Sequence, residues 1–118
     1  MVQASIRISV PPEKLKEVLQ TFTAILGPIR LERGCLSCKC YLDVELENGI
    51  CFIEEWQGRA DLKAHLRSEH FGVLAGALKL FIKDPEIRFH TISSTAGAEA
   101  IKIARAGNSP TITSGGLS

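Results

Sequence analysis

The sequence has almost no net charge, no long hydrophobic run and few aromatic residues. Its 14 Lys and Arg balance 13 Asp and Glu, so it lacks the basic field that attracts a nucleic-acid backbone or an anionic membrane. Its apolar runs are far shorter than the roughly 20 residues that a membrane helix requires. We therefore expect no nucleic-acid partner, no membrane association and a cytoplasmic protein.

Cysteine is present four times, but a reducing cytoplasm would not maintain a disulfide framework. The pattern Cys35-x-x-Cys38-x-Cys40 superficially suggests zinc or redox chemistry. The strand register predicted below, however, places Cys51 about 20 Å from Cys40. We expect small buried hydrophobic side chains and no metal site, with a redox role left open for Cys35 or for a cysteine pair across a dimer.

The overall composition, 45% hydrophobic and 23% charged over 118 residues, is typical of one globular domain with its own core. We place that domain at residues 1–93. Beyond it the sequence turns to Ala, Ser, Thr and Gly, which predicts a C-terminal extension over 94–118. This extension would hold a short helix at 98–105, whose docking side is Ala98, Ile101 and Ala104, and a flexible tail from 108 onward.

Hydrophobic periodicity predicts the order of elements. Alternation over residues 5–10 indicates a strand, and apolar steps of three and four from residue 13 indicate a helix that Gly27-Pro28 would end. Two strands follow at 36–46 and 50–57, then a helical region at 60–80 with a possible break near 68–70, and a last strand at 87–92. The order β-α-β-β-α-β predicts an α+β fold of the ferredoxin-like type with an antiparallel sheet.

The pair Asn48-Gly49 favours a tight two-residue hairpin turn. Such a turn fixes the register between the two middle strands. It would place Tyr41 opposite Trp56, Asp43 opposite Glu54, and Glu45 opposite Phe52, with all six on one face of the sheet.

Three stretches form a recognisable pattern. They are Gly34-Cys35-Leu36-Ser37 before the second strand, Phe52-Ile53-Glu54-Glu55-Trp56 at the end of the third, and Ala64-His65-Leu66-Arg67-Ser68-Glu69-His70-Phe71 in the helical region. Together they resemble the antibiotic biosynthesis monooxygenase family. In that family a Gly-containing turn, an acidic residue with Trp, and an Ala-His followed by His-Phe occupy these places.

The resemblance implies a dimeric α+β barrel, a homodimer in which two four-stranded sheets pack face to face. Each subunit would keep its own cavity between sheet and helices. Many members oxidise phenols or quinols with dioxygen and use no metal, flavin or haem. The haem-degrading relatives carry a histidine near the middle of the second helix, where this chain has Leu74-Ala75-Gly76-Ala77, so no haem and no other cofactor are expected.

Oxidation of this kind requires a base to ionise the substrate hydroxyl and a dry pocket. His65 is the candidate base or orienting donor, because it lies on the apolar stripe that should face the sheet. Glu54 is its candidate partner. Alternatively, His65 is a core histidine satisfied by a polar neighbour, or Glu54 and Asp43 point toward solvent or a subunit interface, in which case Glu55 replaces Glu54.

Trp56, Phe52 and Tyr41 are the candidate walls for an aromatic substrate. The alternative for Trp56 is a filler of the core or of a dimer interface. His70 and Phe71 are placed near the mouth of the pocket, with a solvated His70 beside a core Phe71 as the alternative. His65 and His70 are five residues apart and would diverge on a continuous helix, which disfavours a two-histidine metal site.

We therefore expect a cofactor-independent monooxygenase that acts on a small aromatic substrate with dioxygen. The alternatives are a non-catalytic dimer that binds a small ligand, and an isomerase or lyase acting on a small oxygenated metabolite. In the latter, the same His and Glu would move protons without dioxygen.

Overall fold

Four antiparallel strands form one sheet in a computed structural model of the chain, which describes residues 1–107. In chain order the elements are β1 (Val2–Ser9), η1 (Pro12–Lys14), α1 (Leu15–Arg30), β2 (Cys35–Asp43), β3 (Gly49–Trp56), α2 (Arg59–Leu66), α3 (Glu69–Phe81), β4 (Glu86–Thr91) and α4 (Glu99–Arg105). The strands lie side by side in the order β2-β3-β1-β4. The predicted ferredoxin-like α+β fold is confirmed.

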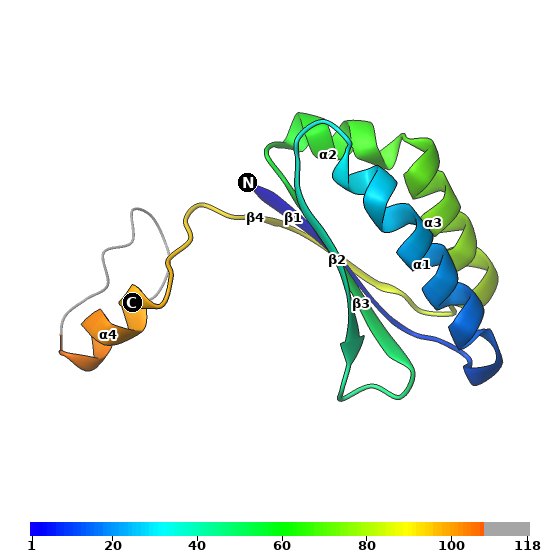
Figure 1. Cartoon of the computed structure of the whole chain (residues 1–118), viewed down its shortest axis with the longest axis horizontal. Coiled ribbons are helices and arrows are strands. Elements are labelled where there is room, and N and C mark those ends of the chain that lie inside the picture. Colours follow the sequence, from blue (N-terminus) through cyan, green and yellow to red (C-terminus); the bar gives the residue numbers. More distant parts are fainter. Residues whose placement is uncertain (108–118) are drawn as a thin grey trace.

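The helices α1, α2 and α3 all cover one face of the sheet, and the other face is left open (Figure 1). This follows from the alternation in β1, where every second residue from Val2 to Ile8 is buried and the residues between them are not. The core lies between this face and α1, which buries Val18, Phe22, Ile25 and Ile29. Of the described helices, none is long and apolar enough to cross a bilayer.

Helix α1 continues through Gly27-Pro28 to Arg30, so the expectation that this pair ends the helix is wrong. Proline removes one backbone hydrogen bond, but two contacts beyond it hold the last turn. Ile29 is fully buried in the core, and the guanidinium Nε of Arg30 donates to the backbone carbonyl of Cys38 at 2.9 Å. Tertiary packing here outweighs the local helix-breaking signal.

The predicted hairpin register is also wrong. Gly49 begins β3 and pairs with Asp43, so Trp56 lies opposite Cys35, Glu54 opposite Cys38, and Tyr41 opposite Cys51. Residues 44–48 form a longer loop, in which Asn48 has a positive φ of 52°.

Two further contacts explain this register. Gly49 has no side chain, so the Asp43 carboxylate extends over it to the Nε of Arg7 on β1, at 2.5 Å. The backbone N–H of Glu45 also donates to the Asp43 carboxylate, at 3.0 Å. The Arg7 guanidinium keeps the pKa of Asp43 below its ordinary value.

The predicted break in the second helical region is confirmed, because α2 ends at Leu66 and α3 begins at Glu69. Ser68 caps α3, since its hydroxyl oxygen accepts the backbone N–H of Phe71 at 3.2 Å. The change of direction between α2 and α3 allows side chains from both helices to approach one point above the end of β3.

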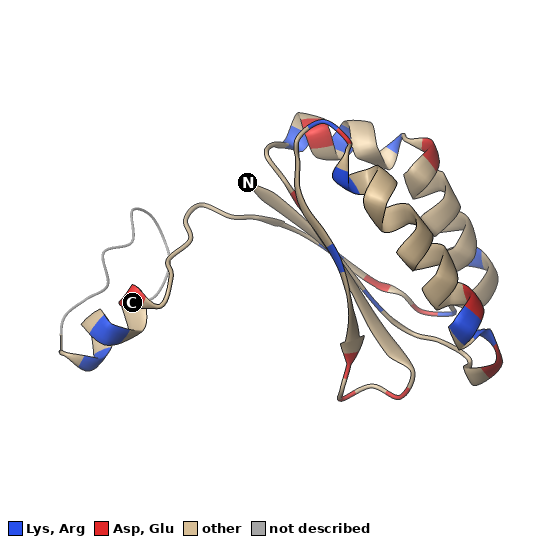
Figure 2. Cartoon of the chain, viewed as in Figure 1, with Lys and Arg blue, Asp and Glu red and all other residues tan. Residues whose placement is uncertain are grey.

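After β4 the chain leaves the sheet as an extended segment that leads to α4, which lies apart from the other helices (Figure 1). The predicted short helix is therefore present, although Ile101, one of its expected docking residues, is largely exposed. The predicted tail at 108–118 lies outside the described residues. Over residues 1–107, charged residues of both signs are interspersed along the elements, with no extended tract of one sign (Figure 2).

Candidate functional site

His65 lies between two carboxylates in the interior of the molecule. Its side chain is completely enclosed, and its Nδ1 is 3.0 Å from Oε1 and 3.1 Å from Oε2 of Glu32. On the other side of the ring, Nε2 is 2.7 Å from Oε2 of Glu54, which is 3% exposed. The ring N–H is not aligned for a hydrogen bond to that oxygen, so this contact is an ion pair.

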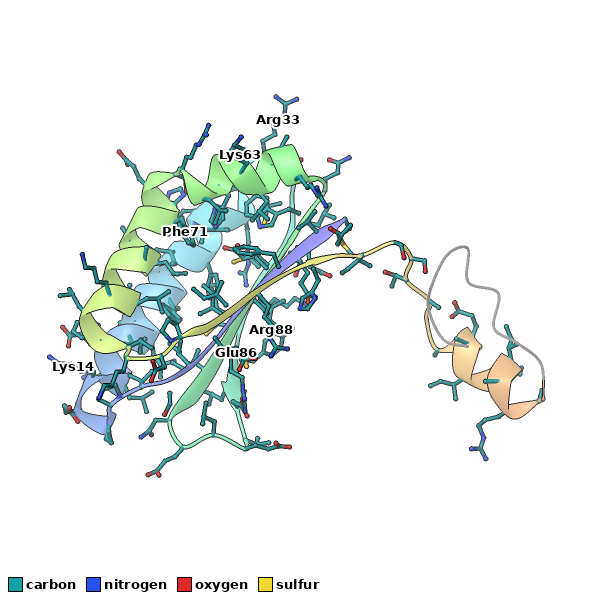
Figure 3. All side chains as sticks on the ribbon, turned by 180° about the vertical axis from the view of Figure 1, so that it is seen from behind. Lys14, Arg33, Lys63, Phe71, Glu86 and Arg88 are labelled. Atoms are coloured by element: carbon teal, nitrogen blue, oxygen red, sulfur yellow. The ribbon has the colours of Figure 1, made fainter. Side chains whose placement is uncertain are left out.

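Two aromatic side chains enclose the imidazole. The indole of Trp56 is stacked on it, with ring centroids 4.5 Å apart and planes 28° apart. Phe71, at the start of α3 (Figure 3), presents an edge to it at 5.5 Å. The indole Nε1 of Trp56 also donates to Oε1 of Glu54 at 3.2 Å. Both oxygens of the Glu54 carboxylate therefore have partners.

The local sequence explains why these groups meet. In β3 alternation turns Phe52, Glu54 and Trp56 toward the helices. His65 follows Leu62 by three residues in α2, so both face the sheet and are buried. The site is thus formed where the end of β3 passes under α2.

Glu32 comes from the turn between α1 and β2. Gly34 in this turn has a φ of 81°, a left-handed conformation that glycine adopts at little cost. Its carbonyl accepts the backbone N–H of Gln57 at 2.8 Å. That bond ties the turn to the residue after Trp56 and so holds the Glu32 carboxylate over α2.

The electrostatics of the site favour a charged imidazole. Burial disfavours the imidazolium, but the hydrogen-bonding and charge interactions with Glu54, and then with Glu32, outweigh it, so the pKa of His65 is raised above its ordinary value. The imidazolium neutralises one of the two carboxylates that flank it. In this state both ring nitrogens of His65 carry a hydrogen, and each nitrogen faces one of the two carboxylates.

His70 also contacts Glu32, with its Nδ1 3.0 Å from Oε2. Its side chain is 39% exposed. The expectation that His65 and His70 diverge holds only for a continuous helix. Because α2 and α3 are separate, both rings instead contact the same carboxylate. Among residues 1–107, no three His, Cys, Asp or Glu side chains are arranged to hold a metal ion.

The aromatic wall predicted from Trp56, Phe52 and Tyr41 is not formed. Tyr41 lies on the open face of the sheet and is 47% exposed, because the true register reverses its side relative to Trp56. Phe52 shares a face with Trp56 but packs edge-on against Phe22 at 5.4 Å, within the hydrophobic core. The aromatic residues beside His65 are instead Trp56 and Phe71.

Of the predicted polar residues, His65 and Glu54 are in contact, whereas Glu55 lies on the open face opposite Ser37 and Gln3. Glu32 was missed by sequence reasoning. The role of Glu32 depends on a turn that only the folded chain brings to α2. Its position two residues before Gly34 was the one feature of the local sequence that could have indicated a site residue.

The four cysteines are free. The correct register places Cys51 next to the pairing partner of Cys40, so the 20 Å separation expected from the sequence is wrong. The two side chains nevertheless leave opposite faces of the sheet. Burial raises the pKa of Cys38 to about 12, and that of Cys35, Cys40 and Cys51 as well. All four are therefore thiols at neutral pH, the less reactive form.

The fold and the site define a class, the ferredoxin-like α+β proteins with a buried polar cluster between sheet and helices. The sequence pattern of one family, described as antibiotic biosynthesis monooxygenase, matches residues 1–76. This is more than half of the chain, which therefore belongs to the antibiotic biosynthesis monooxygenase family.

Several proteins of known sequence or structure are similar to this chain in sequence or in fold. An uncharacterised protein of Synechocystis is 32% identical over 89 residues, which cover 75% of this chain and 60% of that protein. A crystal structure of an antibiotic biosynthesis monooxygenase is 25% identical, with a TM-score of 0.69 over 78% of this chain and 98% of the other. A protein of Deinococcus radiodurans, titled a putative antibiotic biosynthesis monooxygenase, has a TM-score of 0.75 at 19% identity over 82% and 97% of the two chains.

Proposed function

We propose that this protein is a cofactor-independent monooxygenase that oxidises a small aromatic substrate of the quinol or phenol type with dioxygen. The observation that carries the proposal is the enclosed cluster in which Trp56, His65 and Glu54 contact one another. It offers an aromatic surface for stacking beside a carboxylate that can take a proton. Membership of the family supports the same reaction class.

The chemistry needs one proton acceptor and exclusion of water. The substrate hydroxyl gives its proton to the Glu54 carboxylate, whose position is held by His65 and Trp56. The phenolate then transfers an electron to dioxygen, and the two radicals join in a carbon–oxygen bond. The peroxide takes up a proton from Glu54, and the carbon that bears it loses its hydrogen as the O–O bond breaks. This gives a carbonyl and water, so one oxygen atom enters the product and the other leaves as water.

The substrate must displace part of the enclosed cluster, because Trp56 and His65 are at most 1% exposed. The members nearest to solvent are Glu32, His70 and Phe71. We propose that the substrate enters along this edge, between the turn after α1 and the start of α3. Phe71 and His70 would then contact it, as the sequence predicts.

Oxygen consumption by metal-stripped protein, measured against a panel of hydroquinones and polycyclic phenols, tests this function. We expect uptake of one dioxygen per substrate, which falls roughly 100-fold in Glu54→Gln, the lower end of what a positioned acid–base group contributes. Glu69→Gln, the same change at an exposed site on α3, is the matched control and should leave the rate unchanged. Equal uptake by Glu54→Gln and the control would remove Glu54 from the mechanism.

A second function, a non-catalytic dimer that binds a small ligand, is favoured by one observation. The cluster is closed, and its charged groups are paired with one another. If no substrate of the panel supports oxygen uptake but one binds and quenches the fluorescence of Trp56, this second function replaces the first.

We further propose that the protein is a cytoplasmic homodimer joined through the open faces of two sheets. Free cysteines suit a reducing compartment. The open face carries cationic and anionic side chains, including Arg88 and Glu86 on β4 (Figure 3), which pair at 2.8 Å. A face that bears both signs can be complementary to itself across a two-fold axis.

A further inference from the structure

The two histidines and two glutamates of the site form an unbroken chain from solvent to the interior. His70 is partly exposed, and its Nδ1 contacts Oε2 of Glu32 at 3.0 Å. That same oxygen is 3.1 Å from Nδ1 of His65. His65 in turn contacts Glu54 through Nε2 at 2.7 Å. Every step joins two groups that can each gain and lose a proton.

We propose that His70, Glu32 and His65 form a relay that carries protons between solvent and the buried Glu54, with His70 as the group that exchanges with water. The relay's role in removing the substrate's proton rests on the proposed function. The transfer of protons between water and His65, however, can be measured in the protein without substrate. The relay assigns roles to Glu32 and His70 as positioning and proton-carrying residues.

The steps balance without any other reactant. The step starts from the pair in which Glu54 holds the proton and His65 is neutral with its one hydrogen on Nδ1, which is the imidazolium–carboxylate pair with the Nε2 proton moved to Glu54. In the outward direction, Glu54 returns this proton to Nε2 of His65 as His65 releases its Nδ1 proton to Oε2 of Glu32. The proton on this oxygen then passes to Nδ1 of His70, which gives up its Nε2 proton to water. One O–H or N–H bond breaks for each that forms. Because Oε2 of Glu32 faces both rings, the carboxyl group need not rotate between the two transfers.

Enclosure makes such a route necessary. Water does not reach Glu54 or His65 directly, since they are 3% and 1% exposed, and a proton released there has no other ionisable exit at hydrogen-bonding distance among the described residues. Two thiols also interact with these carboxylates, Cys35 with Glu54 and Glu32 and Cys38 with Glu54. Both thiols hold their protons, because burial raises the pKa of each.

The experiment is nuclear magnetic resonance of the ring N–H protons of His65 in nitrogen-15-labelled full-length protein without substrate, near neutral pH. The rate of their exchange with water is compared in wild type, His70→Gln and Glu32→Gln. Glutamine keeps a similar size but cannot pass a proton on. We expect exchange at His65 to slow roughly 100-fold in each variant, the lower end of the contribution of a positioned acid–base group.

The control is Glu69→Gln, which removes a carboxylate beside His70 at an exposed position and should leave the exchange rate of His65 unchanged. Backbone amide exchange in α2 is followed in all variants, and an unchanged rate shows that slower ring exchange does not come from a more rigid helix. If Glu32→Gln fails to fold, His70→Gln decides alone, because its side chain is partly exposed.

Unchanged exchange at His65 in His70→Gln would overturn the proposal, since protons would then reach His65 through direct hydration of Glu32 or through opening of the helix. Slowing that is matched by slower amide exchange in α2 would overturn it too. Neither outcome depends on oxygen uptake. The relay can therefore fail while the monooxygenase function stands, and it can be confirmed in a protein that oxidises none of the substrates tested.

Discussion

At the scale of single residues, the histidine at the centre of the site is as much a structural group as a chemical one. A buried carboxylate is costly unless it is paired, and removing one partner of such a pair costs about 3–5 kcal/mol. His65 meets two of them, and Trp56 supplies a further donor to Glu54. Substitution of His65 by alanine therefore tests stability and chemistry together, which is why Glu54→Gln is the cleaner functional variant.

The charged state of His65 predicts how stability depends on pH. The pKa of His65 in the fold is raised above the ordinary 6.5. The imidazolium therefore contributes its full stabilisation below about pH 6.5. This contribution is lost as the pH rises through the raised pKa. We expect the free energy of unfolding to fall over that interval, by about 1.4 kcal/mol for each unit by which the pKa is raised. Urea unfolding at a series of pH values measures it.

Glu54→Gln should reduce this fall, because it removes the charge that interacts most strongly with His65. Stability that instead increases as the pH rises toward about 6.5, and is constant above it, would mean that burial outweighs the carboxylates and that the pKa of His65 is lowered in the fold.

At the scale of elements, the turn between α1 and β2 decides whether the site is assembled. It carries Glu32, adopts a left-handed conformation at Gly34, and is bonded to the end of β3. It also packs closely on α2, because a side chain at Gly34 would overlap that of Asp61. The turn is therefore held against the end of β3, which carries Glu54 and Trp56, and against α2, which carries His65.

Gly34→Ala should destabilise the protein by roughly 1–3 kcal/mol, since alanine is strained at this φ and displaces Asp61. Thermal unfolding measures the change. The matched control is Gly76→Ala in α3, where an added Cβ meets nothing within 4 Å and should instead stabilise the helix by about 0.5–1 kcal/mol. Equal effects of the two substitutions would show that Gly34 is not constrained.

At the scale of the whole molecule, the open face of the sheet is the surface through which the two copies of the proposed dimer would pack. It presents alternate residues of each strand, among them Ile53, which lies in register with Lys39 and Ser5. The helices leave this face uncovered (Figure 1). A second copy placed there would bury both sheets without touching the cluster around His65.

Sedimentation should therefore give about twice the chain mass of 12.9 kDa, and Ile53→Glu should shift it to the monomer, because the new charge would be buried across a two-fold axis. Leu80→Glu, at an exposed position on α3, makes the same change on the helical side and should leave the dimer intact. Dissociation by Leu80→Glu alone would place the interface on the helices.

The sequence by itself determined the elements and their order, because the periods of strand and helix are local properties of the chain. It also placed His65 and Glu54 on faces that meet, and it located the break between α2 and α3. These results follow from alternation in β3, from the apolar stripe of α2 and from a weak helix signal around Ser68.

Only the tertiary structure decided the register of the hairpin and the full membership of the site. Asp43 pairs with Arg7, and in the register that accompanies this pair Tyr41 lies on the open face of the sheet. Helix α1 extends beyond Pro28, where Ile29 packs in the core. Glu32 and His70 came together across 38 residues. Contacts between distant parts of the chain have no local signature, so the sequence could supply the residues of the site without showing which of them meet.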